Sequence, residues 1–140
     1  MRTLLVPTDG SVVALRALRY AIELARGLKD ARILLLNVQP ELERWYVHGL
    51  LNPEAVAHLR AEGENESAEA RALLGQTNLL HDFEVMYGPP AAVIARVANE
   101  QHCDAIIMGT RGLSDVASAF LGSTAHGVIQ LAEVPVTLVK

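Results

Sequence analysis

The sequence contains a single cysteine, Cys103, and no excess of basic residues, and these shortages exclude several classes of protein. One cysteine cannot form a disulfide within the chain, so a cytoplasmic protein is the simplest expectation. The 12 Lys and Arg residues are outnumbered by 16 Asp and Glu residues, which argues against a broad surface for nucleic acid or for an anionic membrane. We therefore expect neither nucleic acid nor a membrane among the partners.

Long apolar runs are also absent. No stretch approaches the ~20 consecutive apolar residues that a helix needs to span a bilayer. The apolar part of the N-terminal stretch MRTLLVPTDGS is too short for a signal peptide. Apolar residues still make up 51% of the 140 residues, which is enough to bury a core. We therefore expect one folded domain covering residues 1–140.

Five short apolar runs predict the strands of a sheet. Most of them are uninterrupted rather than alternating, which is typical of strands that are covered on both faces, as in a parallel sheet. The run FEVMY alternates, so we expect it nearer an edge. The runs are TLLV (3–6), RILLLNV (32–38), FEVMY (83–87), AIIMG (105–109) and PVTLV (135–139).

Segments with helical periodicity lie between these runs. Apolar residues recur at helical spacing in 11–29 and 90–101, and we expect further helices in 53–76 and in 123–132. Ser11 is a candidate cap for the first helix, whereas Gly63 weakens the middle of the predicted helix in 53–76. Strands that alternate with helices predict a three-layer α/β sandwich with a parallel sheet. The segment 39–53, which holds the only Trp, fits no element and is either a surface connection or a mobile flap.

The stretch GTRGLSDVASAFLGST (109–124) places three glycines directly after a predicted strand. In open parallel sheets, ligands bind beyond the carboxyl ends of the strands, where the strand order reverses. If the strands are ordered 3-2-1-4-5, this stretch and the turn PTDGS after the first strand face one crevice. Neither common phosphate fingerprint is present, because the chain contains no GxxxxGKS or GxxxxGKT and no GxGxxG before the first helix.

The residue types in these two turns suit a nucleotide. Glycines such as Gly109 and Gly112 allow close approach of a ligand to the backbone. A helix that starts at Gly122-Ser123-Thr124 offers amides and a favourable dipole to an anion, and Arg111 adds positive charge. Asp9 only accepts hydrogen bonds, which suits a ribose hydroxyl or a base amino group. Taken alone, however, the glycine stretch is equally explained by a turn and a helix cap.

The spacing of these glycines resembles a known motif. The pattern G-x2-G-x9-G-(S/T) in 109–123 is similar to the nucleotide motif of the universal stress protein family, and the resemblance covers nearly the whole chain. LLVPTDGS, ALRYAIELA, GPPAAVIARVANEQHCDAIIMGTRGLS and VPVTLVK all resemble that family's segments, while the region from about 41 to 75 matches little. The resemblance implies an adenine nucleotide alpha hydrolase-like fold with strand order 3-2-1-4-5, and a homodimer formed through the last strand.

The intact motif also implies a member that binds ATP, and we expect Mg²⁺ or Mn²⁺ on the phosphates. We expect such a protein to act as a nucleotide-dependent regulator in the stress response, through a protein partner that the sequence does not identify. Thr124 departs from the family, whose members often carry Val there. By resemblance, the nucleotide contacts are Pro7, Thr8 and Asp9 near the adenosine, Val38 at the adenine, Met108, Gly109, Arg111 and Gly112 along the ribose and phosphates, and Gly122, Ser123 and Thr124 at the phosphates.

Two alternative functions stay open at this point. One is a dimeric protein-interaction adaptor whose glycine loop is purely structural. The other is a slow ATPase, for which the sequence supplies no evident metal site or water-orienting group. We expect no catalytic residue and no dedicated metal site, since neither the five histidines nor Cys103 show zinc-ligand spacing. Cys103 is expected to be an inert thiol, His126 an ordinary surface residue and Asp115 a solvated loop carboxylate.

Overall fold

The computed structural model describes residues 2–39, 46–47, 50–111 and 121–140. Five strands form one sheet in the order β5-β2-β1-β6-β7, and every neighbouring pair is parallel. Counted among these five strands along the chain, this is the predicted order 3-2-1-4-5, which is therefore confirmed. The strands are β1 (Arg2–Pro7), β2 (Ala31–Gln39), β5 (Leu80–Tyr87), β6 (Ala105–Gly109) and β7 (Val136–Val139).

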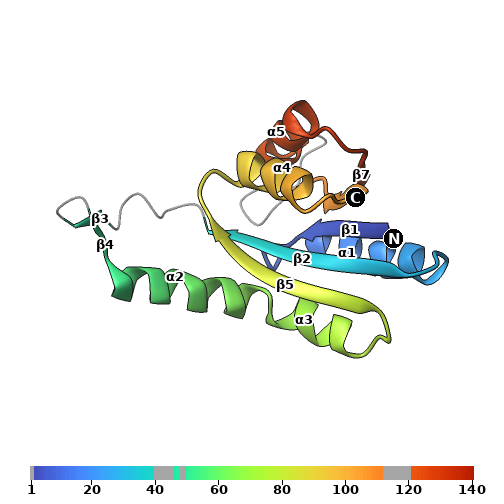
Figure 1. Cartoon of the computed structure of the whole chain (residues 1–140), viewed down its shortest axis with the longest axis horizontal. Coiled ribbons are helices and arrows are strands. Elements are labelled where there is room, and N and C mark those ends of the chain that lie inside the picture. The colour runs from blue at the N-terminus through green and yellow to red at the C-terminus, as the bar shows by residue number, and fades with distance from the viewer. Residues whose placement is uncertain (1, 40–45, 48–49, 112–120) are drawn as a thin grey trace.

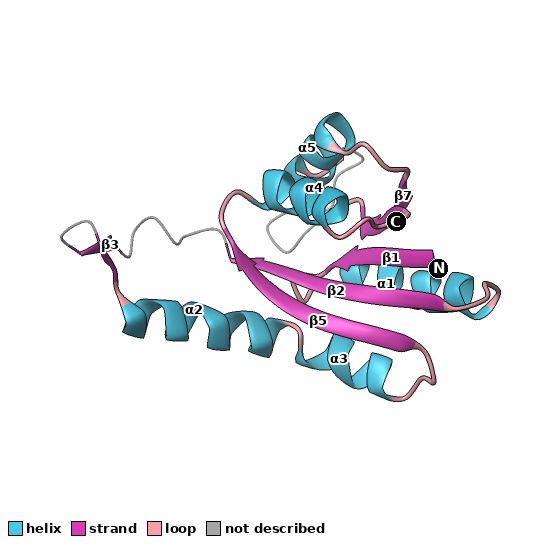
Figure 2. Cartoon of the chain, viewed as in Figure 1, coloured by secondary structure: helices cyan, strands magenta, loops and turns pink. Residues whose placement is uncertain are grey.

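Helices cover both faces of the sheet, as the three-layer prediction requires (Figure 1). One face carries α1 (Val12–Arg26), α2 (Pro53–Glu66) and α3 (Ala68–Gly75), and the other carries α4 (Pro90–Glu100) and α5 (Ser123–Leu131). Figure 2, coloured by secondary structure, also shows the region of a small antiparallel pair, β3 (Tyr46–Val47) and β4 (Leu50–Leu51), which the sequence did not predict. The rest of the segment 40–49 lies outside the described residues.

The uninterrupted apolar runs are explained by burial on both faces. In β1, Leu4 and Val6 pack toward α1, whereas Leu5 between them packs toward α4 and α5. In β2, Ile33 and Leu35 also pack toward α1, whereas Leu34 and Leu36 pack toward α4 and α5. Successive side chains of a strand point to opposite faces, so a strand with helices above and below it must be apolar at every position.

The helix predicted within 53–76 is present as α2, and a second helix that the sequence did not predict, α3, follows it after a break at Ser67. Gly63 weakens helix propensity but has a packing reason to be there. A Cβ at Gly63 would lie 2.7 Å from the Asn37 Oδ1 atom and 2.8 Å from the Val85 Cγ1 atom. The missing side chain therefore lets α2 lie directly against β2 and β5.

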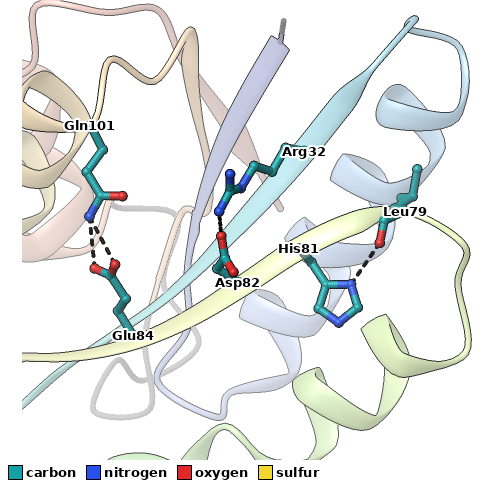
Figure 3. Close-up of polar contacts among 6 residues, drawn as sticks. All are labelled: Arg32, Leu79, His81, Asp82, Glu84 and Gln101. Atoms are coloured by element: carbon teal, nitrogen blue, oxygen red, sulfur yellow. Dashed lines mark hydrogen bonds and ion pairs between the residues drawn. The ribbon is translucent and has the colours of Figure 1, made fainter.

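The strand β5 lies at an edge of the sheet, as its alternating pattern predicts. Its polar side chains make contacts along this edge (Figure 3). Asp82 forms an ion pair with Arg32 of β2, and both Glu84 carboxylate oxygens accept hydrogen bonds from Gln101 Nε2, at 2.9 and 3.1 Å. His81 Nδ1 lies 2.9 Å from the Leu79 carbonyl oxygen. The opposite edge is formed by β7, so the last strand lies at an edge as expected.

Candidate functional site

A pocket opens at the carboxyl ends of β1, β2 and β6, the place where the strand order reverses. Its volume is about 330 Å³, within the range that small-molecule sites occupy. Ten of the eleven predicted site residues line it, and the eleventh, Gly112, lies outside the described residues. The ten are Pro7, Thr8, Asp9, Val38, Met108, Gly109, Arg111, Gly122, Ser123 and Thr124.

The turn after β1 forms the middle of the pocket wall. The Thr8 amide donates to the Leu36 carbonyl at 2.8 Å, which continues the β1–β2 pairing past the end of β1. The Asp9 Oδ1 atom accepts a hydrogen bond from the Ser11 amide at 2.9 Å, and Gly10 has a φ of +84°. A Cβ at Gly10 would also lie 2.9 Å from the Glu66 carbonyl oxygen. The turn therefore forms a hydrogen bond with the N-cap residue of α1 and packs closely against the end of α2.

The first turn of α5 forms one end of the pocket. Gly122 is its N-cap, no side chain of the described residues caps the helix, and the first α-helical bond runs from the His126 amide to the Gly122 carbonyl. Within the described chain, the amides of Ser123, Thr124 and Ala125 have no protein acceptor, and these residues line the pocket. An uncapped helix start combines unpaired donors with the positive end of the helix dipole, and it therefore favours an anion.

The Gly122 amide itself is already used, since it donates to the Thr110 carbonyl at 2.6 Å. The Thr110 amide in turn donates to the Val139 carbonyl at 2.9 Å. These two bonds tie the residue after β6 both to β7 and to the start of α5. The helix start is thus fixed relative to the sheet.

Gly109 serves a purpose that the sequence analysis did not anticipate. We expected its missing side chain to admit a ligand, but a Cβ there would lie 2.6 Å from the Val13 Cγ1 atom of α1. Gly109 therefore admits α1 against the end of β6, even though it also lines the pocket. The backbone of Gly109 does not need the conformational freedom of glycine, because its φ is not positive. Among the described glycines, only Gly10 and Gly88 have a positive φ.

The other end of the pocket holds a polar network that sequence reasoning missed. Glu66 and Gln39 line the pocket, and Asn37 lies behind them, only 1% exposed. The Glu66 Oε2 atom accepts hydrogen bonds from Asn37 Nδ2 at 3.0 Å and from Gln39 Nε2 at 3.1 Å. Gln39 Nε2 also lies 2.8 Å from Asn37 Oδ1, and Asn37 Nδ2 donates to the Thr8 carbonyl at 3.0 Å. The network thus joins β2, α2 and the turn after β1.

One signal in the sequence could have located part of this network. Asn37 and Gln39 are polar residues at the end of an otherwise apolar strand, and they share the face of Ile33 and Leu35. A buried amide needs a hydrogen-bond partner, so these two positions call for a polar neighbour. Glu66 carried no such signal, since it lies in a helix rich in charged residues.

Three further polar or reactive residues, Asp104, Cys103 and His126, are not among the residues that line the pocket. Asp104 lies at the amino end of β6, where its Oδ2 atom accepts a hydrogen bond from the Thr3 amide at 2.7 Å. Cys103 is buried, and burial, followed by the nearby carboxylates of Asp104 and Glu84, raises the pKa of its thiol to about 11. A thiol with so high a pKa is a poor nucleophile, in agreement with the expectation. His126 is exposed on α5, and Asp115 lies outside the described residues.

The part of the chain that the structure describes contains no group of three or more His, Cys, Asp or Glu residues placed to hold a metal ion. Among the same residues, no helix is both long and apolar enough to cross a bilayer.

Comparison with known proteins agrees with the fold and the motif. The model of the universal stress protein family matches residues 1–140. A universal stress protein of Thermus aquaticus is 35% identical over 139 residues, which cover 99% of this chain and 98% of the relative.

Solved structures resemble the chain over nearly its whole length. The structure of MJ0577 from Methanocaldococcus jannaschii superposes with a TM-score of 0.86 at 29% identity, covering 99% of this chain and 95% of that one. The universal stress protein of Archaeoglobus fulgidus, solved in complex with dAMP, has a TM-score of 0.73 at 24% identity and covers 100% and 98% of the two chains. The chain belongs to the universal stress protein family.

Proposed function

We propose that this protein binds ATP and acts as a nucleotide-dependent regulator in the stress response. The observation that carries the proposal is the pocket, which has unpaired amides of α5 at one end and hydrogen-bond acceptors at the other. An elongated ligand with an anion at one end and donor groups at the other fits this arrangement. A nucleotide has these properties, because its phosphates are anionic and its sugar and base carry hydroxyl and amino groups.

Related structures support an adenine nucleotide as the ligand. The Archaeoglobus fulgidus protein is described in complex with dAMP, and two further solved members of the fold hold AMP and cAMP. These three ligands share an adenine and one phosphate. We extend the assignment to ATP because the first turn of α5 leaves three amides for phosphate oxygens, and because the mouth of the pocket adds the guanidinium of Arg111.

We propose that the residues meet the parts of the nucleotide in a definite order. The amides of Ser123, Thr124 and Ala125 would hold phosphates, Asp9 would accept from the ribose, and Val38 would pack on the base. Mg²⁺ or Mn²⁺, if bound with ATP, would be held mainly by phosphate oxygens and water, since the described residues offer no ready cluster of protein ligands.

We further propose a cytoplasmic homodimer that pairs through β7 and that signals to a protein partner. The strand β7 lies at the edge of the sheet, and its four residues are only partly buried within one chain. An edge strand presents unpaired backbone groups that a second copy can complete. Hydrolysis of ATP is expected to be slow at most, because the described residues offer no group of three or more His, Cys, Asp or Glu placed to hold a catalytic metal.

The decisive experiment places a negative charge at the phosphate end without harming the helix. Ser123→Asp adds a carboxylate in the first turn of α5, a position where acids stabilise helices. We expect this variant to remain folded and to bind ATP at least ~10-fold more weakly by titration calorimetry, because the new carboxylate competes for the amides and repels phosphate. Gln130→Glu changes the net charge equally at the exposed far end of the same helix and serves as the control.

The proposal fails if the wild-type protein shows no heat with ATP and Mg²⁺, or if both variants bind ATP as tightly as the wild type. A mass spectrum of small molecules released from denatured purified protein gives an independent reading, since an adenine nucleotide in stoichiometric amount would support the proposal.

One observation favours the adaptor alternative in part. Because Gly109 admits α1, at least one glycine of the motif has a structural purpose without any ligand. A protein that dimerises normally and binds its partner equally well with and without ATP would fit that function.

A further inference from the structure

The carboxylate of Glu66 is the unexplained feature of the pocket. Its Oε2 atom is satisfied by the amide groups of Asn37 and Gln39, at 3.0 and 3.1 Å. Within the described part of the chain, no protein group donates to its Oε1 atom, and no Lys, Arg or His forms an ion pair with it. Glu66 is partly buried and lines the pocket. Among the described residues, the protein thus holds one carboxylate oxygen in place and leaves the other without a donor.

The place of Glu66 in the fold indicates which part of a nucleotide it would meet. The amides of α5 follow β6, the turn containing Asp9 follows β1, and Glu66 is bound to the end of β2. Neighbouring strands lie about 4.8 Å apart, so roughly 10 Å separates the β6 end of the pocket from the β2 end. With phosphate at α5, the sugar lies over β1 and the base reaches β2.

We propose that Glu66 is a specificity-determining residue that accepts a hydrogen bond from the exocyclic amino group of adenine. A carboxylate can only accept, and the 6-amino group is the donor at the outer edge of an adenine. Asn37 and Gln39 are positioning residues, because their amides fix the carboxylate. This inference rests on the proposed nucleotide function and adds to it the means by which the base is selected.

The network also predicts what an amide at position 66 would do. In Glu66→Gln, the side-chain oxygen must take the place of Oε2, since it is the only atom that can accept from Asn37 and Gln39. The new NH₂ group then faces the ligand. A donor there opposes the 6-amino group of adenine but suits the 6-oxo group of hypoxanthine. The substitution should therefore reverse the preference rather than merely weaken binding.

The test measures the affinity of the purified protein for three nucleotides by titration calorimetry. These are ATP, ITP with a 6-oxo group, and purine riboside triphosphate with neither group. For the wild type we expect ATP to bind about 10- to 100-fold more tightly than the purine analogue, the range for one hydrogen bond to a charged group. In Glu66→Gln we expect weaker binding of ATP and tighter binding of ITP. Glu62→Gln, on the exposed side of the same helix, should match the wild type.

Each possible result has a distinct meaning. If the wild type binds ATP but Glu66→Gln keeps the wild-type ratios among the three nucleotides, the inference is wrong and the proposed function stands. A fourth nucleotide, 3′-deoxy-ATP, tests a contact with the sugar. If Glu66→Gln changes only the ratio of ATP to 3′-deoxy-ATP, the carboxylate contacts the sugar, and the assignment to the base is wrong. If the wild type binds none of the nucleotides, the proposed function fails, and the inference fails with it.

Discussion

Three helices, α1, α4 and α5, begin at the pocket, and among them α1 and α5 make the clearest contrast, because α1 is capped by a side chain of its own. The Ser11 Oγ atom accepts a hydrogen bond from the Ala14 amide at 3.1 Å, and Ala14 lines the pocket. The start of α5 has glycine at the N-cap and, among the described residues, no such bond. A missing cap commonly costs about 1 kcal/mol of stability, and at α5 it leaves amides of the first turn that a ligand would satisfy.

The largest loss of stability should come from a substitution that moves the start of α1 away from the end of β6. In Gly109→Ala, the new Cβ would lie 2.6 Å from Val13 Cγ1 and 3.2 Å from the Val13 backbone carbon, so α1 must move away from β6. We expect a loss of about 1–3 kcal/mol in the free energy of unfolding, measured with urea, as for other overpacked sites. ATP affinity should fall as well, because both helix starts line the pocket.

A second substitution tests the cause of that loss. Val13→Ala removes the atom nearest to the added Cβ, so the double variant should recover part of the stability that Gly109→Ala loses. Gly75→Ala is the control, since a Cβ at Gly75 meets nothing within 4 Å, and its effect should be near zero or slightly stabilising. Strictly additive effects of the Val13 and Gly109 substitutions would show that the close contact does not limit stability.

The α5 end of the pocket was predictable from sequence because its parts are local. The glycine spacing in 109–123 and the predicted helix start at Ser123 lie within one continuous stretch, directly after an apolar run. The turn PTDGS was placed opposite by a rule about parallel sheets rather than by its own residues. The same local patterns gave the five main strands and the helices α1, α4 and α5.

The Glu66 end was not predictable, because its residues come together only through packing. Asn37 and Glu66 are 29 positions apart, and they meet because Gly63 lets α2 lie against β2. The break between α2 and α3 has a similar origin. It falls at Ser67, which is fully buried in the fold, although the sequence around it reads as a charged helix. Periodicity reports which residues could face a core, but not how closely two elements approach.

A smaller effect is expected from removing the cap of α1. Ser11→Ala deletes the acceptor for the Ala14 amide and should lower the free energy of unfolding by about 1 kcal/mol. Because Ser11 acts on its own helix, ATP affinity should stay within ~3-fold of the wild type. Ser123→Ala is the matched control at the uncapped helix, and it should change stability by less than ~0.5 kcal/mol. An equal loss of stability in both variants would contradict the distinction between the two helix starts.

The smallest change in ATP affinity should come from a substitution of Thr124. It tests whether backbone amides or side-chain hydroxyls of α5 bind the phosphate. Thr124→Val keeps the main-chain amide in the first turn and removes only the hydroxyl. If the amides hold the phosphate, ATP affinity should change by less than ~3-fold in calorimetry, whereas a hydroxyl bonded to a charged phosphate would cost ~10-fold or more on removal. Valine is β-branched like threonine, so the backbone and rotamer preferences are retained. A loss as large as that of Ser123→Asp would show that side chains, rather than the uncapped amides, dominate this end of the pocket, and the contrast between α1 and α5 would lose its functional meaning.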